Sequence, residues 1–480
     1  MADAVVAGAS IAGLAAALAL AGTGHRVRVL ERSAPPPDGP IEQAASSWHR
    51  PTVPQAIHSH TLTSVGVQVL RTRAPRVLQA ALAAGAELLD LTEALPPLVE
   101  DRTRQVDDDQ LAALACRRSV LELVLYRAVR ALPQVRIDHG ITVRGLALDP
   151  SLRRVRAVLT SGGERLPAGL VVDATGRRAD SRDWLAAAGV PLAEDLTHPS
   201  AITGYSRQYR LRGTTRPGPL NRGNAAGGVW DHYAAALHPG DNHTFAVAVM
   251  MPPGDRQTAG LREAEGFTAA ARATPGIGAW LAPSVAEPLT PVNIIGCPPN
   301  RLSGHATTRQ RPVAGLFPVG DAACVTNPLY GRGMSLALDH AFRLADLAAG
   351  AEADSDLGHA AARLAEELFT PWYEFAVQED RQRAARWSAA TGTGHPAAPR
   401  QKASGEQAGP NQVQAATLTD PLVWRSVTRV LMGLSTPAEV FGDDKFLARV
   451  RQAPPLDPAL LPPAPSRHEL VQAVKTTEGG

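Results

Sequence analysis

Residues 4–31, AVVAGASIAGLAAALALAGTGHRVRVLE, decide the fold of this chain. A short apolar run leads into a glycine turn at Gly8 and Gly13, an Ala/Leu-rich segment follows, and a second strand-like run ends in Glu31. This order predicts a strand, a helix and a parallel strand, the unit that binds dinucleotides. Gly8 permits the sharp turn and Gly13 lets the helix lie close to the strand. The helix N-terminus then offers free N–H groups to a pyrophosphate.

The turn departs from the usual glycine pattern at one position. Ser10 stands where the middle glycine normally approaches the pyrophosphate most closely. Serine is the next smallest polar residue, and its hydroxyl can donate to a phosphate. We therefore expect a phosphate-binding turn made of Gly8, Ser10, Ile11, Ala12 and Gly13. Glu31, at the tip of the second strand, is expected to accept a hydrogen bond from a ribose hydroxyl.

Composition limits the classes of protein to consider. The 480 residues suffice for two or three domains, and a net charge of +2 without a basic block argues against a nucleic-acid partner. Cys116, Cys297 and Cys324 are far apart, which argues against a disulfide framework or a metal site. No uninterrupted apolar run could span a membrane. The sequence therefore predicts a cytoplasmic protein with no transmembrane segment.

Hydrophobic periodicity predicts the other elements. Helices are expected over about 60–84, 118–132 and 331–349, and buried strands over 169–173 and 313–319. Residues 33–57 are rich in Pro, Ser and Gly and predict a long loop, and the acidic run 107–109 predicts a solvated turn. Short alternating strands between about 195 and 300 indicate an antiparallel sheet, and the chain beyond 351 is predicted to be mostly helical.

A second motif lies three hundred residues after the first. Gly320-Asp321-Ala322-Ala323 follows a buried strand, and Asn327-Pro328-Leu329-Tyr330-Gly331-Arg332-Gly333-Met334 leads into a helix. An aspartate at a strand tip can bind a sugar or ribityl hydroxyl. The amides from Gly331 to Met334 form the positive end of a helix, which would stabilise the negative charge of a reduced flavin.

With both motifs, the chain resembles the flavoprotein monooxygenases of the para-hydroxybenzoate hydroxylase type over about residues 3–345. The resemblance implies FAD as cofactor, with Asp321 on the ribityl chain and Pro328 near the flavin C4a atom. It places Gly331, Gly333 and Met334 at the pyrimidine edge. It also implies that Glu31 binds the adenosine ribose with Arg32 beside it, that Arg118 lies near the pyrophosphate, and that Val143 meets the adenine.

A closer resemblance rests on Arg50-Pro51-Thr52-Val53-Pro54-Gln55-Ala56-Ile57-His58-Ser59-His60. This segment is similar to a signature of the flavin-dependent epoxidases of polyether biosynthesis, relatives of squalene epoxidase found in natural-product pathways. The resemblance makes Arg50 a candidate flavin contact. No side chain is assigned to catalysis, for which Pro328, Gln55 and His58 are candidates. The competing interpretation of the histidines is a helix start satisfied by backbone groups.

A third family motif is matched by Asp173-Ala174-Thr175-Gly176 through Arg182. Its usual acid is replaced by Thr175. Since this motif contributes to both FAD and NAD(P)H use in the family, the replacement brings direct NAD(P)H binding into question.

The family resemblance implies that O₂ reacts with reduced FAD to give a C4a-hydroperoxyflavin. This donor would insert one oxygen atom into an apolar, small-molecule biosynthetic intermediate by epoxidation or hydroxylation. NAD(P)H would supply the electrons directly or through a separate flavin reductase. Two alternatives stay open. One is an FAD-dependent C=C reductase of the geranylgeranyl reductase type, and the other is a redox-neutral cyclase or binding protein that uses FAD structurally.

The predicted fold is α/β, or α+β overall. It consists of an FAD-binding, Rossmann-like βαβ domain of the glutathione-reductase type, an inserted antiparallel-sheet substrate domain, and a helical C-terminal region. We assign 1–75, 110–190 and 300–350 to the FAD-binding domain. Residues 76–109 and 191–299 are assigned to the substrate domain, and 351–480 to the C-terminal region with a linker near 391–410. A monomer or a homodimer is expected.

Overall fold

A five-stranded parallel sheet forms the centre of the computed structural model, which describes residues 3–151, 153–351, 354–392, 409–457 and 463–475. Its order is β18 (Leu316–Pro318), β9 (Leu170–Asp173), β1 (Asp3–Ala7), β2 (Arg26–Glu31) and β5 (Val135–His139). Every neighbouring pair in this sheet is parallel. The carboxyl ends of all its strands therefore lie at one edge.

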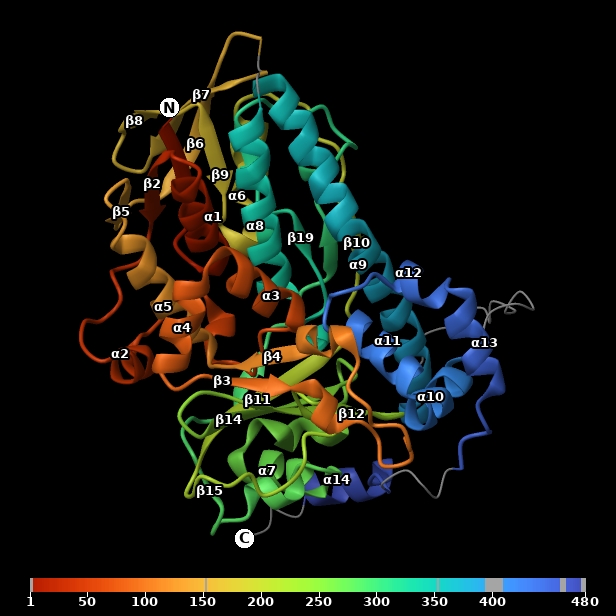
Figure 1. The fold of residues 1–480 in the computed structure, drawn as a ribbon. Coiled ribbons are helices and arrows are strands. Elements are labelled where there is room, and N and C mark those ends of the chain that lie inside the picture. The colour runs from red at the N-terminus through yellow and green to blue at the C-terminus, as the bar shows by residue number, and fades with distance from the viewer. Residues whose placement is uncertain (1–2, 152, 352–353, 393–408, 458–462, 476–480) are drawn as a thin grey trace.

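Both faces of the parallel sheet are covered (Figure 1). On one face α1 (Ile11–Gly22) packs against α8 (Gly333–Gly350), with α3 (Ser64–Arg73) and α5 (Arg118–Arg130) beside them. The alanine-rich sequence of α1 lets it lie close to these neighbours. The other face carries an antiparallel sheet of β6 (Val143–Leu148), β7 (Val155–Thr160) and β8 (Arg165–Pro167), together with α6 (Asp180–Ala187). These layers confirm the predicted α/β domain.

A separate antiparallel sheet forms within the region predicted for it. Its order is β12 (Ala226–Val229), β13 (Ala234–Pro239), β14 (Thr244–Met251), β11 (Thr203–Leu211) and β15 (Ala286–Pro288), and β16 (Asn293–Ile295) also pairs with β11. One face of the sheet buries Tyr205, Phe245 and Val249 against α7 (Ala264–Ala273) and α14 (Arg467–Lys475). The other face is directed toward the parallel-sheet domain (Figure 1).

Smaller elements join the two main sheets. They comprise α2 (Ile41–Ser47), α4 (Pro75–Ala83), the pair β3 (Glu87–Asp90) and β4 (Ala112–Ala115), and the small sheet of β10 (Leu196–His198), β17 (Asn300–Leu302) and β19 (Cys324–Val325).

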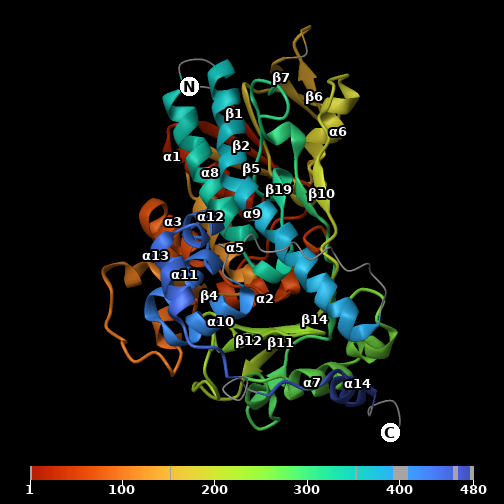
Figure 2. The same cartoon turned by 90° about the vertical axis from the view of Figure 1, so that its right-hand side faces the viewer.

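The C-terminal region is helical, as predicted. The long helix α9 (Asp354–Thr391) runs from α8 down to the antiparallel sheet (Figure 2). It is followed by α10 (Pro410–Thr419), α11 (Pro421–Leu431), α12 (Pro437–Phe441) and α13 (Asp444–Gln452). The linker predicted near 391–410 falls between α9 and α10, and its residues 393–408 lie outside the described part of the chain. Among the described residues, none of the helices combines the length and the apolarity that a membrane crossing requires.

Three local predictions need correction. The helix predicted over 60–84 is divided into α3 and α4 at Ala74, because a proline at 75 disfavours helical backbone in the residue before it. The predicted loop 33–57 contains the short helix α2. The run 107–109 is not wholly solvated, because Asp108 is only 2% exposed and accepts hydrogen bonds from Nε and Nη2 of Arg425, both at 2.8 Å.

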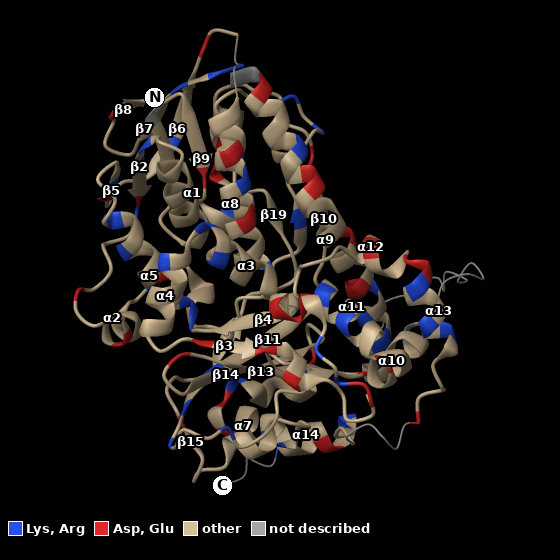
Figure 3. Ribbon diagram, viewed as in Figure 1, with Lys and Arg blue, Asp and Glu red and all other residues tan. Residues whose placement is uncertain are grey.

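In Figure 3 charged residues of both signs are interspersed over the outer elements.

Candidate functional site

Three loops leave the carboxyl edge of the parallel sheet side by side. Ala7 of β1 and Pro318 of β18 both pair with Asp173 of β9. The pairing continues past the strands, since the N–H of Ala174 donates to Ala7 O at 3.0 Å and that of Val319 to Asp173 O at 2.9 Å. The segments that begin the three sequence motifs therefore meet at one edge, where ligands bind in open α/β sheets.

The glycine turn after β1 has no room for side chains. Gly8 has φ +106°, and a Cβ on it would lie 2.6 Å from Ala174 O. A Cβ on Gly13 would lie 1.9 Å from Gly8 O, so the helix and the turn are in direct backbone contact. Helix α1 begins after Ser10 without a side-chain cap, which leaves its first N–H groups available to a ligand.

Glu31 holds this turn in place. Its Oε2 accepts from the N–H of Ala9 and its Oε1 from that of Ser33, both at 2.8 Å, and the residue is 6% exposed. Its carbonyl accepts from the N–H of Ile141 at 3.0 Å, which brings the start of β6 and the buried Val143 beside the end of β2. Two carboxylate oxygens with one donor each retain lone pairs for a ribose hydroxyl.

Two arginines and a glutamate stand beside the turn. Nη2 of Arg118 donates to Oγ of Ser10 at 3.0 Å, which places the predicted pyrophosphate arginine against the turn. Glu122, one helical turn further along α5, pairs with Nε of Arg118 at 3.4 Å and with Nη1 of Arg50. The guanidinium of Arg50 also lies over the Trp48 ring at 4.4 Å. Arg50 is thus connected to Arg118 through one buried carboxylate.

The second motif meets the first through Gly320. A Cβ on Gly320 would lie 3.0 Å from the Cβ atoms of both Ala12 in α1 and Ala337 in α8. Asp321 follows, and a Cβ on Gly333 would lie 3.7 Å from its Oδ1. Burial raises the pKa of Asp321, an effect that the nearby Arg118, together with Arg177 and Arg301, opposes. The topology therefore joins the two motifs across three hundred residues.

The carboxylate of Asp321 accepts no hydrogen bond from any residue in the described part of the chain. Helix α8 likewise begins without a side-chain cap. Gly331, with φ +64°, and Gly333 are exposed just before and at its start, whereas Met334 is buried. An unsatisfied acid, two uncapped helix ends and a turn that excludes side chains fit a dinucleotide with a polar chain between its ends, as in FAD.

The segment 55–60 lies against the antiparallel sheet. Nδ1 of His58 is 2.8 Å from Oγ of Ser206 in β11, and Nδ1 of His238 in β13 is 2.8 Å from Oγ of Ser59. Burial lowers the pKa of His58 to about 4 and that of His238 to about 3. Of the two candidate histidines, His60 is the one whose ring is satisfied by a backbone group, since its Nδ1 is 2.9 Å from the His58 carbonyl oxygen.

The remaining candidates, Gln55, Arg32 and Pro328, make no side-chain hydrogen bond to the antiparallel sheet among the described residues. Oε1 of Gln55 is buried with no hydrogen-bond partner among the described residues. Nη2 of Arg32 lies 3.5 Å from the Thr52 carbonyl oxygen, and Pro328 is exposed on the loop before α8. The N–H of His58 donates to the Gln55 carbonyl oxygen at 3.2 Å, but no side-chain hydrogen bond among the described residues joins Gln55, His58 and Pro328. All three stay candidates for a catalytic role.

An apolar cluster lies between the antiparallel sheet of β11–β16 and the second motif. Its buried members are Ile202, Ala234, Ala248, Met250, Ile295 and Trp387, with Cys297 and Leu329 packed against them. Leu329 belongs to the loop before α8, whereas Met250 and Ala248 come from β14. The cluster therefore brings apolar side chains of the antiparallel sheet up to the loop that would face a flavin.

Thr175 is engaged within the third motif. Its hydroxyl donates to Oδ1 of Asp173 at 2.6 Å and accepts from the N–H of Asp180 at 2.9 Å. Oδ2 of Asp173 accepts from the N–H of Ser181 at 2.9 Å. The threonine thus fixes the start of α6.

Sequence reasoning missed two groups at the site. Glu122 could have been found, because it stands four residues after Arg118 on a predicted helix, the spacing of an ion pair. Asp380 in α9, which binds the loop before α8, had no comparable signal, since only the tertiary structure brings the two segments together.

The fold is shared with solved structures of flavin-dependent enzymes, among them FAD-dependent monooxygenases. It is similar to PqsL, a probable FAD-dependent monooxygenase from Pseudomonas aeruginosa, with a TM-score of 0.56 and 16% identity over 81% of this chain and 98% of that one. A flavoprotein/dehydrogenase from Cytophaga hutchinsonii gives a TM-score of 0.61 and 15% identity over 94% of this chain and 99% of that one. The Diels-Alderase PyrE3 of pyrroindomycin biosynthesis gives 0.56 and 18% over 91% and 81%.

No family model matches the chain. Protein Rv3254 of Mycobacterium tuberculosis is 30% identical to it over 376 residues, which make up 69% of this chain and 70% of Rv3254. The chain belongs to the same family as Rv3254.

Proposed function

We propose that the chain is an FAD-dependent monooxygenase that inserts one oxygen atom of O₂ into a small apolar biosynthetic intermediate by epoxidation or hydroxylation. The observation that carries this proposal is the meeting of α1 and α8 at one edge of the parallel sheet, with the unsatisfied carboxylate of Asp321 beside their N-termini. The fold shared with PqsL supports it. Because one fold can host several chemistries, the reaction needs a direct test.

The residues around that edge would each bind one part of FAD. The turn from Gly8 to Gly13 would bind the pyrophosphate through the N–H groups of α1, with Arg118 alongside. Glu31, Arg32 and Val143 would hold the adenosine. Asp321 would bind the ribityl chain.

The amides of Gly331, Gly333 and Met334 would face the pyrimidine edge of the flavin. When bound and reduced, FAD supplies the electrons that activate O₂. The N-terminus of α8 would favour the anionic reduced ring by about 0.3–1 kcal/mol.

The substrate would bind between the antiparallel sheet and the loop before α8. The apolar cluster around Met250 and Leu329 supports an apolar ligand, since burying its surface there costs no polar hydrogen bond. His58 would present a neutral imidazole at the rim of this space, because its pKa is lowered to about 4. Water exclusion by such a cluster would protect the reactive oxygen. NAD(P)H is the proposed reductant, directly or through a flavin reductase.

A second candidate is a redox-neutral cyclase that uses FAD structurally. The similarity of its fold to that of PyrE3, described as a Diels-Alderase, favours including it. The C=C reductase also stays among the alternatives because it would use the same flavin site.

One set of measurements separates these functions. Purified protein is tested for a flavin spectrum, and NAD(P)H-dependent oxygen uptake is followed with a panel of alkenes and phenols. Substrate-dependent oxygen uptake that matches product formation supports the monooxygenase. Alkene reduction under anaerobic conditions would support the reductase instead, and turnover with a flavin analogue that cannot be reduced would support the cyclase. A chain that binds no FAD would overturn all three.

A further inference from the structure

The carboxylate of Asp380 in α9 is a hub for the loop before α8. Asp380 is fully buried, and its Oδ1 accepts from Nδ2 of Asn327 at 2.8 Å and from the Tyr330 hydroxyl at 3.0 Å. Nη2 of Arg383 donates to the same oxygen at 2.7 Å, and Nδ2 of Asn300 donates to Oδ2 at 2.7 Å. Four donors, one of them cationic, compensate the buried charge.

Two of these donors lie on either side of Pro328. Asn327 also accepts from the N–H of Leu329 at 2.9 Å, and its own N–H donates to Oδ1 of Asn300 at 2.7 Å. Tyr330 is the last residue of the same turn. One carboxylate therefore fixes both ends of the turn that exposes Pro328 toward the proposed flavin site.

Helix α9 also holds the residue that follows this turn. Arg332 is 1% exposed, and its guanidinium lies over the rings of Trp372 at 4.5 Å and Phe375 at 5.3 Å, both from α9. Burial lowers the pKa of Arg332 to about 10, so it stays cationic at neutral pH. The stretch from Asn327 to Arg332 is thus anchored to α9 before and after Gly331.

The same segment of α9 reaches the antiparallel sheet. Arg383 donates to the carbonyl oxygens of Ser200 and Ala201 and lies 4.8 Å from the Trp387 ring. Nε1 of Trp387 donates to the Trp230 carbonyl oxygen at 2.8 Å, and its ring belongs to the apolar cluster that includes Leu329. One helical segment therefore touches both the proposed flavin loop and the proposed substrate space.

We propose that Asp380 is a positioning residue that sets the Asn327–Gly331 turn against the flavin and couples its position to substrate held on the antiparallel sheet. This inference rests on the proposed function, because it assigns the turn to the flavin. Asp380 touches neither cofactor nor substrate and acts through Asn327 and Tyr330. Without it, the turn would keep its sequence motif but lose the acceptor that both ends share.

The test compares Asp380→Asn and Tyr330→Phe with the control Glu374→Gln, which changes an exposed acid on the same helix. Tyr330→Phe removes one hydroxyl and leaves the Asp380–Arg383 ion pair, so it tests the idea even if Asp380→Asn fails to fold. We expect amide hydrogen exchange across 327–334 to be at least tenfold faster in both variants of the FAD-free protein, and unchanged in the control. We also expect a shifted flavin absorption band and a several-fold larger share of O₂ released as hydrogen peroxide, with an unchanged KM for NAD(P)H.

Exchange rates, flavin spectra and peroxide yields equal to those of Glu374→Gln would overturn the role of Asp380 while leaving the monooxygenase intact. If exchange across 327–334 is faster in both variants but the wild-type protein cannot bind FAD, the proposed function is contradicted. In that case Asp380 orders the turn, but for another ligand.

Discussion

Glu31 is a buried acid of the proposed FAD site and Asp321 is a half-buried one, and their surroundings differ. The Glu31 carboxylate is occupied by the N–H groups of Ala9 and Ser33, so it is part of the folded turn. Asp321 has no donor among the described residues, and burial raises its pKa. An acid whose pKa is raised on folding destabilises the protein at pH values above that pKa. A bound ligand that donates a hydrogen bond to this carboxylate would reduce that cost.

Asp321→Asn is therefore expected to weaken FAD binding without destabilising the protein. A hydrogen bond to a charged group contributes about 1.5–3 kcal/mol, which corresponds to a roughly 10- to 150-fold weaker Kd. The FAD-free variant should unfold at the same or a higher temperature, because a half-buried charge without a hydrogen-bond donor among the described residues is removed. Fluorescence titration and thermal denaturation measure the two effects, with Asp346→Asn on the surface of α8 as control. An unchanged Kd would contradict the site assignment.

Gly13→Ala should abolish FAD binding. The new methyl group would lie 1.9 Å from Gly8 O, which forces α1 away from the turn. Gly22→Ala is the matched control, because a Cβ at that end of α1 meets nothing within 4 Å. The flavin content of the purified proteins decides the matter. Equal yellow colour in both variants would show that the backbone contact at Gly13 is not needed for the cofactor.

Among the elements, α5 connects three predicted ligands through Glu122, a residue to which the sequence assigned no role. Glu122 pairs with Arg50 and Arg118, and Arg118 reaches Ser10 in the turn before α1. As whole residues, Arg50, Arg118 and Glu122 are each at most 9% exposed. The position of Arg118 thus depends on α5 beginning at the right place relative to α1.

Glu122→Gln is expected to destabilise the protein by about 3–5 kcal/mol, because two buried guanidinium groups would lose their shared counter-ion. Urea denaturation of the FAD-free protein measures this loss. Adding Arg50→Met should recover part of it, since only Arg118 would then be unpaired. A single-variant loss below about 1 kcal/mol, as is typical of exposed pairs, would show that the pairs are not isolated from water.

The sequence predicted those elements whose cause is local. Gly8, Gly13 and Glu31 stand at the spacings of a dinucleotide-binding βαβ unit, and the structure confirms this unit. The break at Ala74 was missed because the apolar periodicity of α3 continues into α4 across the proline at 75. Asp108 was misjudged for another reason. Its partner Arg425 is separated from it by more than three hundred residues, and no local pattern reports such a pair.

In the whole molecule, the part of the site that would bind the cofactor could be predicted from local motifs, whereas the part formed by the C-terminal helices could not. The two nucleotide motifs come together because β18 pairs with β9, which pairs in turn with β1. The approach of α9 to the loop before α8 depends on side-chain packing between Trp372, Phe375 and Arg332, for which periodicity gives no partner. The position of α9 against this loop could therefore not be predicted from the sequence.

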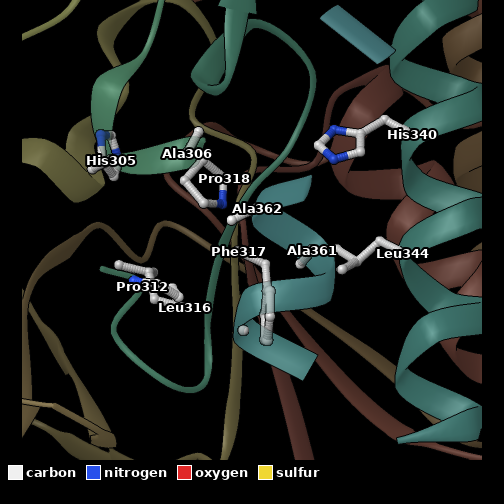
Figure 4. Close-up of a pocket in the computed structure, with 11 residues that line it drawn as sticks. His305, Ala306, Pro312, Leu316, Phe317, Pro318, His340, Leu344, Ala361 and Ala362 are labelled. Carbon is white, nitrogen blue, oxygen red and sulfur yellow. The ribbon is translucent and has the colours of Figure 1, made fainter. Parts of the chain in front are cut away.

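Residues of β18, α8 and α9 line a small, partly open pocket of about 20 Å³, which has room for one water molecule (Figure 4). His340 of α8 lines it together with Leu344, Phe317 and Ala361. The His340 ring meets the Phe369 ring edge-on at 4.9 Å, and its Nδ1 has no hydrogen-bond partner among the described residues. Burial lowers the pKa of His340 to about 3.

His340 should therefore make the stability of the whole protein depend on pH. Between its folded pKa of about 3 and the ordinary value of 6.5, the unfolded chain binds a proton that the folded chain does not. Stability must then fall as the pH is lowered through this range, with a slope from this one group of up to about 1.4 kcal/mol per pH unit. His340→Met should remove that part of the slope, whereas Leu344→Met, at the same cavity, should retain it. Urea denaturation at several pH values between 7 and 5 measures the slopes. Equal slopes for the two variants would mean that His340 takes up a proton in the folded state, which its apolar surroundings oppose.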